Sequence, residues 1–164
     1  MTVPTLREPA HLVSPNAVRY WALGALIGAL VLWVVLVVAY VVVPEGIKTW
    51  LGPVAIALLV LRLVHLVAMP TVRYRVHRWE VTPTAIYTRA GWLTREQRIA
   101  PLSRVQTVDS QQGPVMRMFR LSSITVTTAS AAGPITIACL DQEVARQVVA
   151  ELTEITGRSE GDAT

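Results

Sequence analysis

The sequence has 164 residues and a formal net charge of +4, from 15 basic and 11 acidic residues. Lys48 is the only lysine, and an arginine bias of this kind can reflect nucleotide composition, so the charge makes no case for a nucleic-acid partner. The single cysteine, Cys139, excludes a disulfide framework within one chain.

The first apolar block runs over residues 20–43 and carries no ionisable side chain except the Tyr20 and Tyr40 phenols. As a helix it is about 36 Å long, enough to cross about 30 Å of hydrocarbon. It lacks the polar stripe of a helix that covers a soluble core, and its apolar run is too long for a cleaved signal peptide. The block therefore predicts a transmembrane helix, after an N-terminal tail over residues 1–19.

A second apolar block, residues 51–69, is about 28 Å long as a helix and contains Arg62 and His65 on one helical face. An ionisable residue inside a membrane marks a functional site that faces a partner or a watery cavity. Alternatively, Arg62 lies near the cytoplasmic end and snorkels to the headgroups. The sequence leaves both interpretations open. The two blocks together predict a transmembrane hairpin over residues 20–70.

Two glycines four residues apart, Gly24 and Gly28, form a G-x-x-x-G pair in the first block. Small residues at this spacing permit close approach of a second helix, because no side chain holds the two backbones apart. We expect a helix-packing role for this face, either within the hairpin or between copies of the chain.

The orientation follows from the basic residues beside the apolar blocks. The loop between the blocks has Lys48 with Glu45 close by, whereas three arginines, Arg73, Arg75 and Arg78, follow the second block. Because positive residues stay on the cytoplasmic side, we expect a multi-pass protein of the plasma (inner) membrane with both termini in the cytoplasm.

The same three arginines, together with Arg62, are the candidate contacts with the membrane surface. A basic stretch beside the cytoplasmic leaflet is attracted to anionic lipid, each charge contributing about 1 kcal/mol. The alternative is that Arg73, Arg75 and Arg78 belong to the solvated face of an ordinary sheet. The sequence does not separate these two interpretations.

The remainder of the chain predicts a domain of about seven short antiparallel strands, closed by one amphipathic helix. Period-two alternation is clearest over residues 121–128, and Gly and Pro mark several of the turns. From Asp141 the period changes: Val144, Val148 and Leu152 recur at helical spacing, and Gly157 is placed as a stop. We expect strands at residues 74–81, 85–89, 92–99, 105–109, 121–128 and 135–139. The domain spans residues 71–157, followed by a flexible tail over 158–164.

Three segments of this domain resemble the bacterial pleckstrin-homology-like (PH-like) domain of YdbS/YdbT-type membrane proteins. They are the turn Arg89-Ala-Gly91, the core IAPLSRVQTV at residues 99–108, and the strand ITVTT at residues 124–128. The resemblance implies a bent, seven-stranded antiparallel barrel with a C-terminal helical cap. One departure is that the family carries a glycine near the short helix in mid-domain, whereas this chain has residues FRLS at 119–122.

The resemblance does not imply phosphoinositide binding. Eukaryotic relatives bind such lipids through a basic loop between their first two strands, and the corresponding loop here, residues 82–84, has no charge. Fold alone does not fix function. The family is best described as a membrane-linked interaction module.

Motifs of catalysis are missing from the sequence. The three histidines are far apart, with no metal-binding spacing, and there is no glycine-rich phosphate loop or nucleophile elbow. Cys139 lies in an apolar strand, where a small core residue is expected rather than a nucleophile. We therefore expect no catalytic residue, metal or cofactor, and no enzyme.

Three functions remain. The first is a non-enzymatic, membrane-anchored PH-like scaffold that binds a protein partner, or other copies of the chain, at the cytoplasmic leaflet. An exposed strand edge would let a peptide add to the sheet as another strand. The second is a module that engages anionic lipid, and the third is an accessory subunit of an envelope enzyme or transporter.

Overall fold

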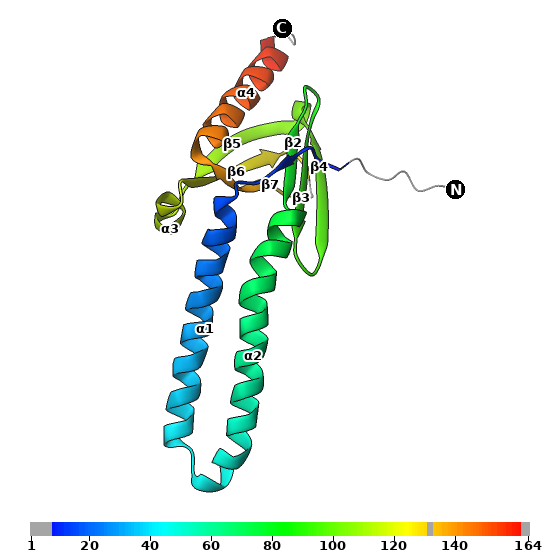
Figure 1. Cartoon of the computed structure of the whole chain (residues 1–164). Coiled ribbons are helices and arrows are strands. Elements are labelled where there is room, and N and C mark those ends of the chain that lie inside the picture. Colours follow the sequence, from blue (N-terminus) through cyan, green and yellow to red (C-terminus); the bar gives the residue numbers. More distant parts are fainter. Residues whose placement is uncertain (1–7, 131–132, 162–164) are drawn as a thin grey trace, which may run out of the picture.

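The computed structural model describes residues 8–130 and 133–161, and it consists of a long helical hairpin joined to one end of a β-rich domain (Figure 1). The hairpin is α1 (Asn16–Val42) and α2 (Glu45–Val76). Within the described residues, the domain adds the strands β1 (His11–Leu12), β2 (Arg78–Val81), β3 (Ala85–Gly91), β4 (Arg95–Pro101), β5 (Val105–Gln111), β6 (Leu121–Thr128) and β7 (Ile135–Asp141), and the helices η1 (Leu102–Arg104), α3 (Pro114–Met118) and α4 (Gln142–Gly161).

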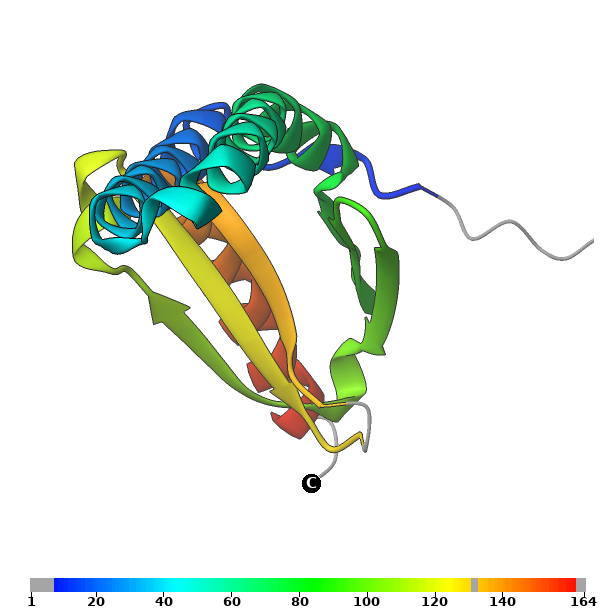
Figure 2. The same cartoon turned by 90° about the horizontal axis from the view of Figure 1, so that it is seen from below.

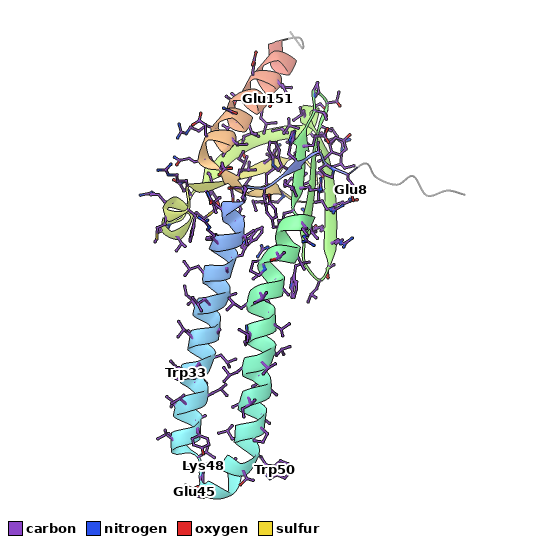
Figure 3. All side chains as sticks on the ribbon, viewed as in Figure 1. Glu8, Trp33, Glu45, Lys48, Trp50 and Glu151 are labelled. Atoms are coloured by element: carbon purple, nitrogen blue, oxygen red, sulfur yellow. The ribbon has the colours of Figure 1, made fainter. Side chains whose placement is uncertain are left out.

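Both hairpin helices are long and apolar enough to cross a membrane. Their most apolar windows have mean hydropathies of 2.9 and 2.2, and no part of either window is buried by the rest of the chain. At the far turn of the hairpin, Lys48 pairs with Glu45 at 2.6 Å (Figure 3). Trp50, which is 78% exposed, lies near the same turn, a position typical of an interfacial tryptophan.

The strands form two antiparallel sheets with the orders β1-β2-β3-β4 and β5-β6-β7. Figure 2, which looks along the hairpin, shows the two sheets on opposite sides of the domain interior. The C-terminal helix α4 packs against η1 and the three strands of the second sheet. This arrangement of seven described strands and one helical cap confirms the fold that the sequence predicts.

The core lies between the two sheets and α4. Ile86 of β3, Ile124 of β6 and Leu152 of α4 are each fully buried in one apolar cluster. Ala145 and Val148 join it from the same face of α4, as their helical spacing predicts. The helix therefore covers an apolar sheet surface that water would otherwise contact.

Part of the expected tail over residues 1–19 belongs to the domain, whereas residues 1–7 lie outside the described residues. His11 and Leu12 pair with Trp79 and Arg78 of β2, so β1 is an edge strand of the first sheet. The Ser14 hydroxyl donates a hydrogen bond to the Asp141 carboxylate at 2.7 Å. The hairpin thus leaves the domain after β1 and returns to it at β2.

Two other boundaries differ from expectation. Residues 74–76, expected as strand, continue α2, because Met69 and Val76 bury their side chains against the domain and hold this last part of the helix in place. At the other end, α4 runs past Gly157 to Gly161. One helical glycine costs only about 1 kcal/mol, which is not enough to end a helix. Residues 162–164, the rest of the expected tail, lie outside the described residues.

Candidate functional site

A cavity of about 520 Å³ lies between α1 and α2, in the half of the hairpin next to the domain. We call it the hairpin cavity. Its lining brings together residues that the sequence analysis treats as separate candidates: Gly24 and Gly28 from α1, and Arg62, His65 and Arg73 from α2. The candidate helix-packing face and two of the candidate lipid contacts therefore belong to one site.

Helical periodicity explains this convergence. Arg62, His65, Met69 and Arg73 follow one another at spacings of three or four residues, so they lie on one face of α2. The two helices run side by side and antiparallel (Figure 1). This face of α2 lines the same cavity as the face of α1 that carries Gly24 and Gly28. The hairpin register then sets which residues lie opposite each other.

The two glycines line open space. A Cβ atom built at Gly24 or Gly28 meets no other atom within 4 Å, apart from the neighbouring residues and backbone of its own helix. Within the hairpin, the glycines thus leave room between the helices instead of bringing the two backbones into contact. Packing between copies of the chain remains a prediction.

The mouth of the cavity, towards the domain, is built around Trp21. The Arg73 guanidinium lies 4.5 Å from the centre of the Trp21 ring, a cation–π contact. The His77 ring lies 5.0 Å from the same indole, and its Nδ1 is 2.8 Å from the Arg73 carbonyl oxygen. Burial lowers the pKa of His77 from its ordinary value, the hydrogen bond to the Arg73 carbonyl partly opposes this, and the nearby Arg73 charge lowers the pKa again. His77 is therefore neutral at pH 7, and its Nδ1–H donates to the carbonyl.

A turn of the first sheet contacts His65, one of the residues that line the cavity. The Trp92 ring, between β3 and β4, meets the His65 ring edge-on at a centroid distance of 5.3 Å. Gly91 makes this turn possible: its φ is +120°, and a Cβ there would lie 1.8 Å from the Thr94 carbonyl oxygen. The sequence predicts the turn but no site at Trp92. The signal in the sequence is a pair of apolar residues in the turn between β3 and β4, Trp92 and Leu93, of which Leu93 is 82% exposed.

A second hollow, of about 380 Å³, lies beside the first and shares Arg62 and His65 with it. We call it the outer groove. Its other lining residues are apolar or aromatic: Leu32, Leu58, Leu61, Val64, Ala68 and Trp92. Arg62 and His65 thus separate a cavity with polar groups from a groove that is otherwise apolar.

The remaining candidate arginines lie elsewhere. Arg75 is exposed, and its position two residues after Arg73 places it on a different face of α2. Arg78 lies in β2, opposite Arg89, and its Nε is buried without a hydrogen-bond partner in the described part of the chain. The four arginines therefore do not form one surface: Arg62 and Arg73 line the cavity, whereas Arg75 and Arg78 do not.

Another hollow, of about 410 Å³, lies at the free edge of the first sheet. We call it the strand groove. It is lined by β4 from Glu96 to Pro101, by Arg104, and by residues around the β6–β7 turn such as Thr128 and Ile135. Arg98 crosses it, donating to the Pro134 carbonyl oxygen at 3.1 Å.

The geometry offers no catalytic constellation among the described residues. No group of three or more His, Cys, Asp or Glu side chains in that part of the chain could hold a metal ion. Cys139 is buried, and burial raises the pKa of its thiol to about 11. A thiol of this kind is protonated at pH 7 and is a poor nucleophile.

Comparison with known proteins agrees with this architecture. A family model described as Bacterial PH domain matches residues 18–156, a span that includes the hairpin and most of the domain. The chain is also similar to the UPF0699 transmembrane protein YdbS of Bacillus subtilis (strain 168). The identity is 29% over 154 residues, covering 91% of this chain and 96% of that protein. No solved structure matches the chain.

Proposed function

Because this chain belongs to the bacterial PH domain family, we propose that it is a non-enzymatic interaction module anchored in the inner membrane. Both termini are cytoplasmic, and the domain binds a protein partner at the cytoplasmic leaflet. The observation that carries this proposal is the strand groove, an opening of about 410 Å³ along the free edge of β4.

The edge of β4 is suited to an extended peptide. In the described sheets β4 pairs only with β3, and β7 only with β6, so each presents an outer row of backbone N–H and C=O groups. Such an edge is a template for one more strand, with main-chain hydrogen bonds giving affinity and side-chain pockets giving specificity. Ile99, which is 45% exposed, and Arg104 favour a segment that carries both apolar and acidic residues.

The anchor adds a fixed geometry to this edge. Since the hairpin leaves and re-enters the first sheet between β1 and β2, the domain is attached to the membrane through two connections rather than one flexible linker. Val13, Ala17, Trp21 and Met69 share a buried cluster with Leu121 and Cys139 of the domain. The groove is therefore held at a defined height and direction, which is what a scaffold requires.

A photo-crosslinking amino acid at a groove position tests the proposal in intact cells. Gln97 lines the groove and is exposed, and Gln147, exposed on α4, is the matched control. We expect one discrete crosslinked product from position 97 and none from position 147. Equal crosslinking from both positions, or none from position 97, contradicts the proposal. A product of twice the chain mass would identify a second copy as the partner.

A second role, engagement of anionic lipid, is favoured by a different observation. Arg62 and Arg73 line the hairpin cavity together, and neither makes an ion pair with a carboxylate in the described residues. An integral protein floats with vesicles of any composition, so flotation cannot test this role. The measurement is instead which lipids stay bound to the full chain after it is extracted and purified in detergent. We expect anionic lipid to be retained in preference to zwitterionic lipid.

A further inference from the structure

The charges of the hairpin cavity match an anion. Two guanidinium groups and one imidazole line it, and none of its described lining residues is Asp or Glu. Arginine pairs with phosphate through geometry that allows two parallel hydrogen bonds, which makes it suited to phosphate recognition. The imbalance of charge therefore favours an anionic ligand over a neutral or cationic one.

The depth of Arg62 strengthens this argument. With Trp50 at the opposite membrane surface, Arg62 lies about 18 Å along α2, some 12 Å short of the inner boundary of a hydrocarbon core of about 30 Å. A charged side chain at such a depth is costly unless it meets an anion, water or protein partner. Arg73 lies about 16 Å farther along the helix, at headgroup level. A ligand between them would be bound from both ends.

The spacing between Arg62 and Arg73 favours an elongated, amphiphilic ligand over a small ion. About 16 Å of helix rise separates Arg62 from Arg73, so a ligand that contacts both side chains extends along the cavity, as a phospholipid headgroup with its glycerol unit does. The openness at Gly24 and Gly28 gives the headgroup room between the helices.

The outer groove supplies a place for the apolar part of such a ligand. It adjoins Arg62 and His65, and Leu32, Leu58 and Leu61 line its deeper part. A polar cavity towards the domain and an apolar groove towards the middle of the membrane follow the order of a lipid in the leaflet. Trp92 covers the groove from the domain side.

We propose that the hairpin cavity binds an anionic phospholipid of the cytoplasmic leaflet. The phosphate binds at Arg62 and His65, the polar headgroup extends towards Arg73 at the mouth, and an acyl chain occupies the outer groove. This site rests on the lipid-engaging role proposed above and is independent of the strand groove.

Native mass spectrometry of the full chain in detergent micelles tests the proposal by titration with phosphatidylglycerol and, in parallel, phosphatidylcholine. Three variants are compared. Arg62→Gln removes a charge from the cavity, and Gly28→Leu fills the cavity but keeps both arginines. The control, Arg75→Gln, removes an equal charge from another face of α2. We expect Arg62→Gln to weaken phosphatidylglycerol binding at least about tenfold, the loss of one charge-assisted contact. Gly28→Leu should weaken it similarly, and Arg75→Gln should leave it unchanged.

Each other outcome overturns part of the proposal. If Arg75→Gln weakens binding as much as Arg62→Gln, or if Gly28→Leu binds normally, the cavity is not the site, although the lipid-engaging role stands. If the unmodified chain shows no preference for phosphatidylglycerol, both the role and the site fail. Displacement of the lipid by millimolar inorganic phosphate would overturn the lipid assignment in favour of a free-anion site. A thermal unfolding transition shows whether the Arg62→Gln variant is folded. If that variant is not folded, lipid binding by Gly28→Leu tests the cavity site instead.

Discussion

Single residues of this chain occupy backbone positions that their side chains disfavour. Arg120 follows α3 with a φ of 55°, in the left-handed region that glycine adopts most easily. The family that the chain resembles has a glycine in this part of the domain, whereas this chain has residues FRLS at 119–122. The fold keeps the turn and tolerates the strain, because Gln142 donates a hydrogen bond to the Arg120 carbonyl at 2.9 Å.

Arg120→Gly should therefore stabilise the chain. A left-handed non-glycine residue costs about 1–2 kcal/mol, and the extra flexibility of glycine in the unfolded chain costs about 0.5–1 kcal/mol. The net gain is about 0–1.5 kcal/mol, seen as a higher unfolding midpoint. Arg117→Gly, three residues earlier and inside α3, is the control and should lower the midpoint. Equal effects of the two variants would show that φ is not the cause.

His77 should make stability depend on pH. The pKa of His77 in the folded chain is lowered, chiefly by burial. As the pH falls, the unfolded chain therefore binds a proton at His77 before the folded chain does. The stability from neutral His77 is present above about pH 6.5 and is lost as pH falls towards the folded pKa. Replacing His77 by Asn, whose amide can donate to Arg73, should remove this component from the unfolding midpoint measured against pH.

His11→Asn is the matched control for that measurement. His11 is exposed in β1, and its replacement leaves His77 in place, so the acid-side loss of stability should persist. An unchanged pH profile in His77→Asn would show that another group causes the loss.

At the level of elements, the sequence predicts what periodicity and length encode. The two apolar blocks, the alternation in β6 and the amphipathic face of α4 are strong patterns, and all appear in the structure. β1 could not be predicted, because two residues carry no period and His11–Leu12 is a strand only through its pairing with β2. The hairpin cavity could not be predicted either. The sequence indicates Gly24 and Arg62 as separate candidates, but only the register of α1 against α2 shows that both line one cavity.

The role of β1 predicts how the chain can be divided. A fragment of residues 72–164 lacks β1 and the buried residues Val13, Ala17, Trp21 and Met69, so we expect it to give no cooperative unfolding transition by circular dichroism. A shortened chain that joins residues 8–22 to residues 69–164 through a short Gly/Ser linker keeps these contacts. It should unfold cooperatively and resist protease.

Equal stability of the two fragments would contradict this prediction. It would show that the first sheet closes without its edge strand, and that the buried cluster around Trp21 adds nothing to the domain.

At the scale of the whole molecule, the hairpin and the domain form one unit. The chain crosses from β1 into α1 and from α2 into β2 at the same end, and Trp21, Arg73 and His77 stack where the two parts meet. The hairpin cavity opens beside this stack, and the strand groove lies on the far sheet edge. One proposed site thus lies along the hairpin and the other on the domain, and buried contacts join these two parts.

The orientation of this unit in the membrane is the premise of both proposed sites. In a Cys139→Ala background, single cysteines are placed at Thr49, in the hairpin turn, and at Gln147, on α4; both positions are exposed. A membrane-impermeant maleimide is then applied to intact cells. We predict that position 49 reacts at once, and that position 147 reacts only after the membrane is permeabilised. Labelling of position 147 but not position 49 in intact cells would place the domain outside and contradict a module held at the cytoplasmic leaflet.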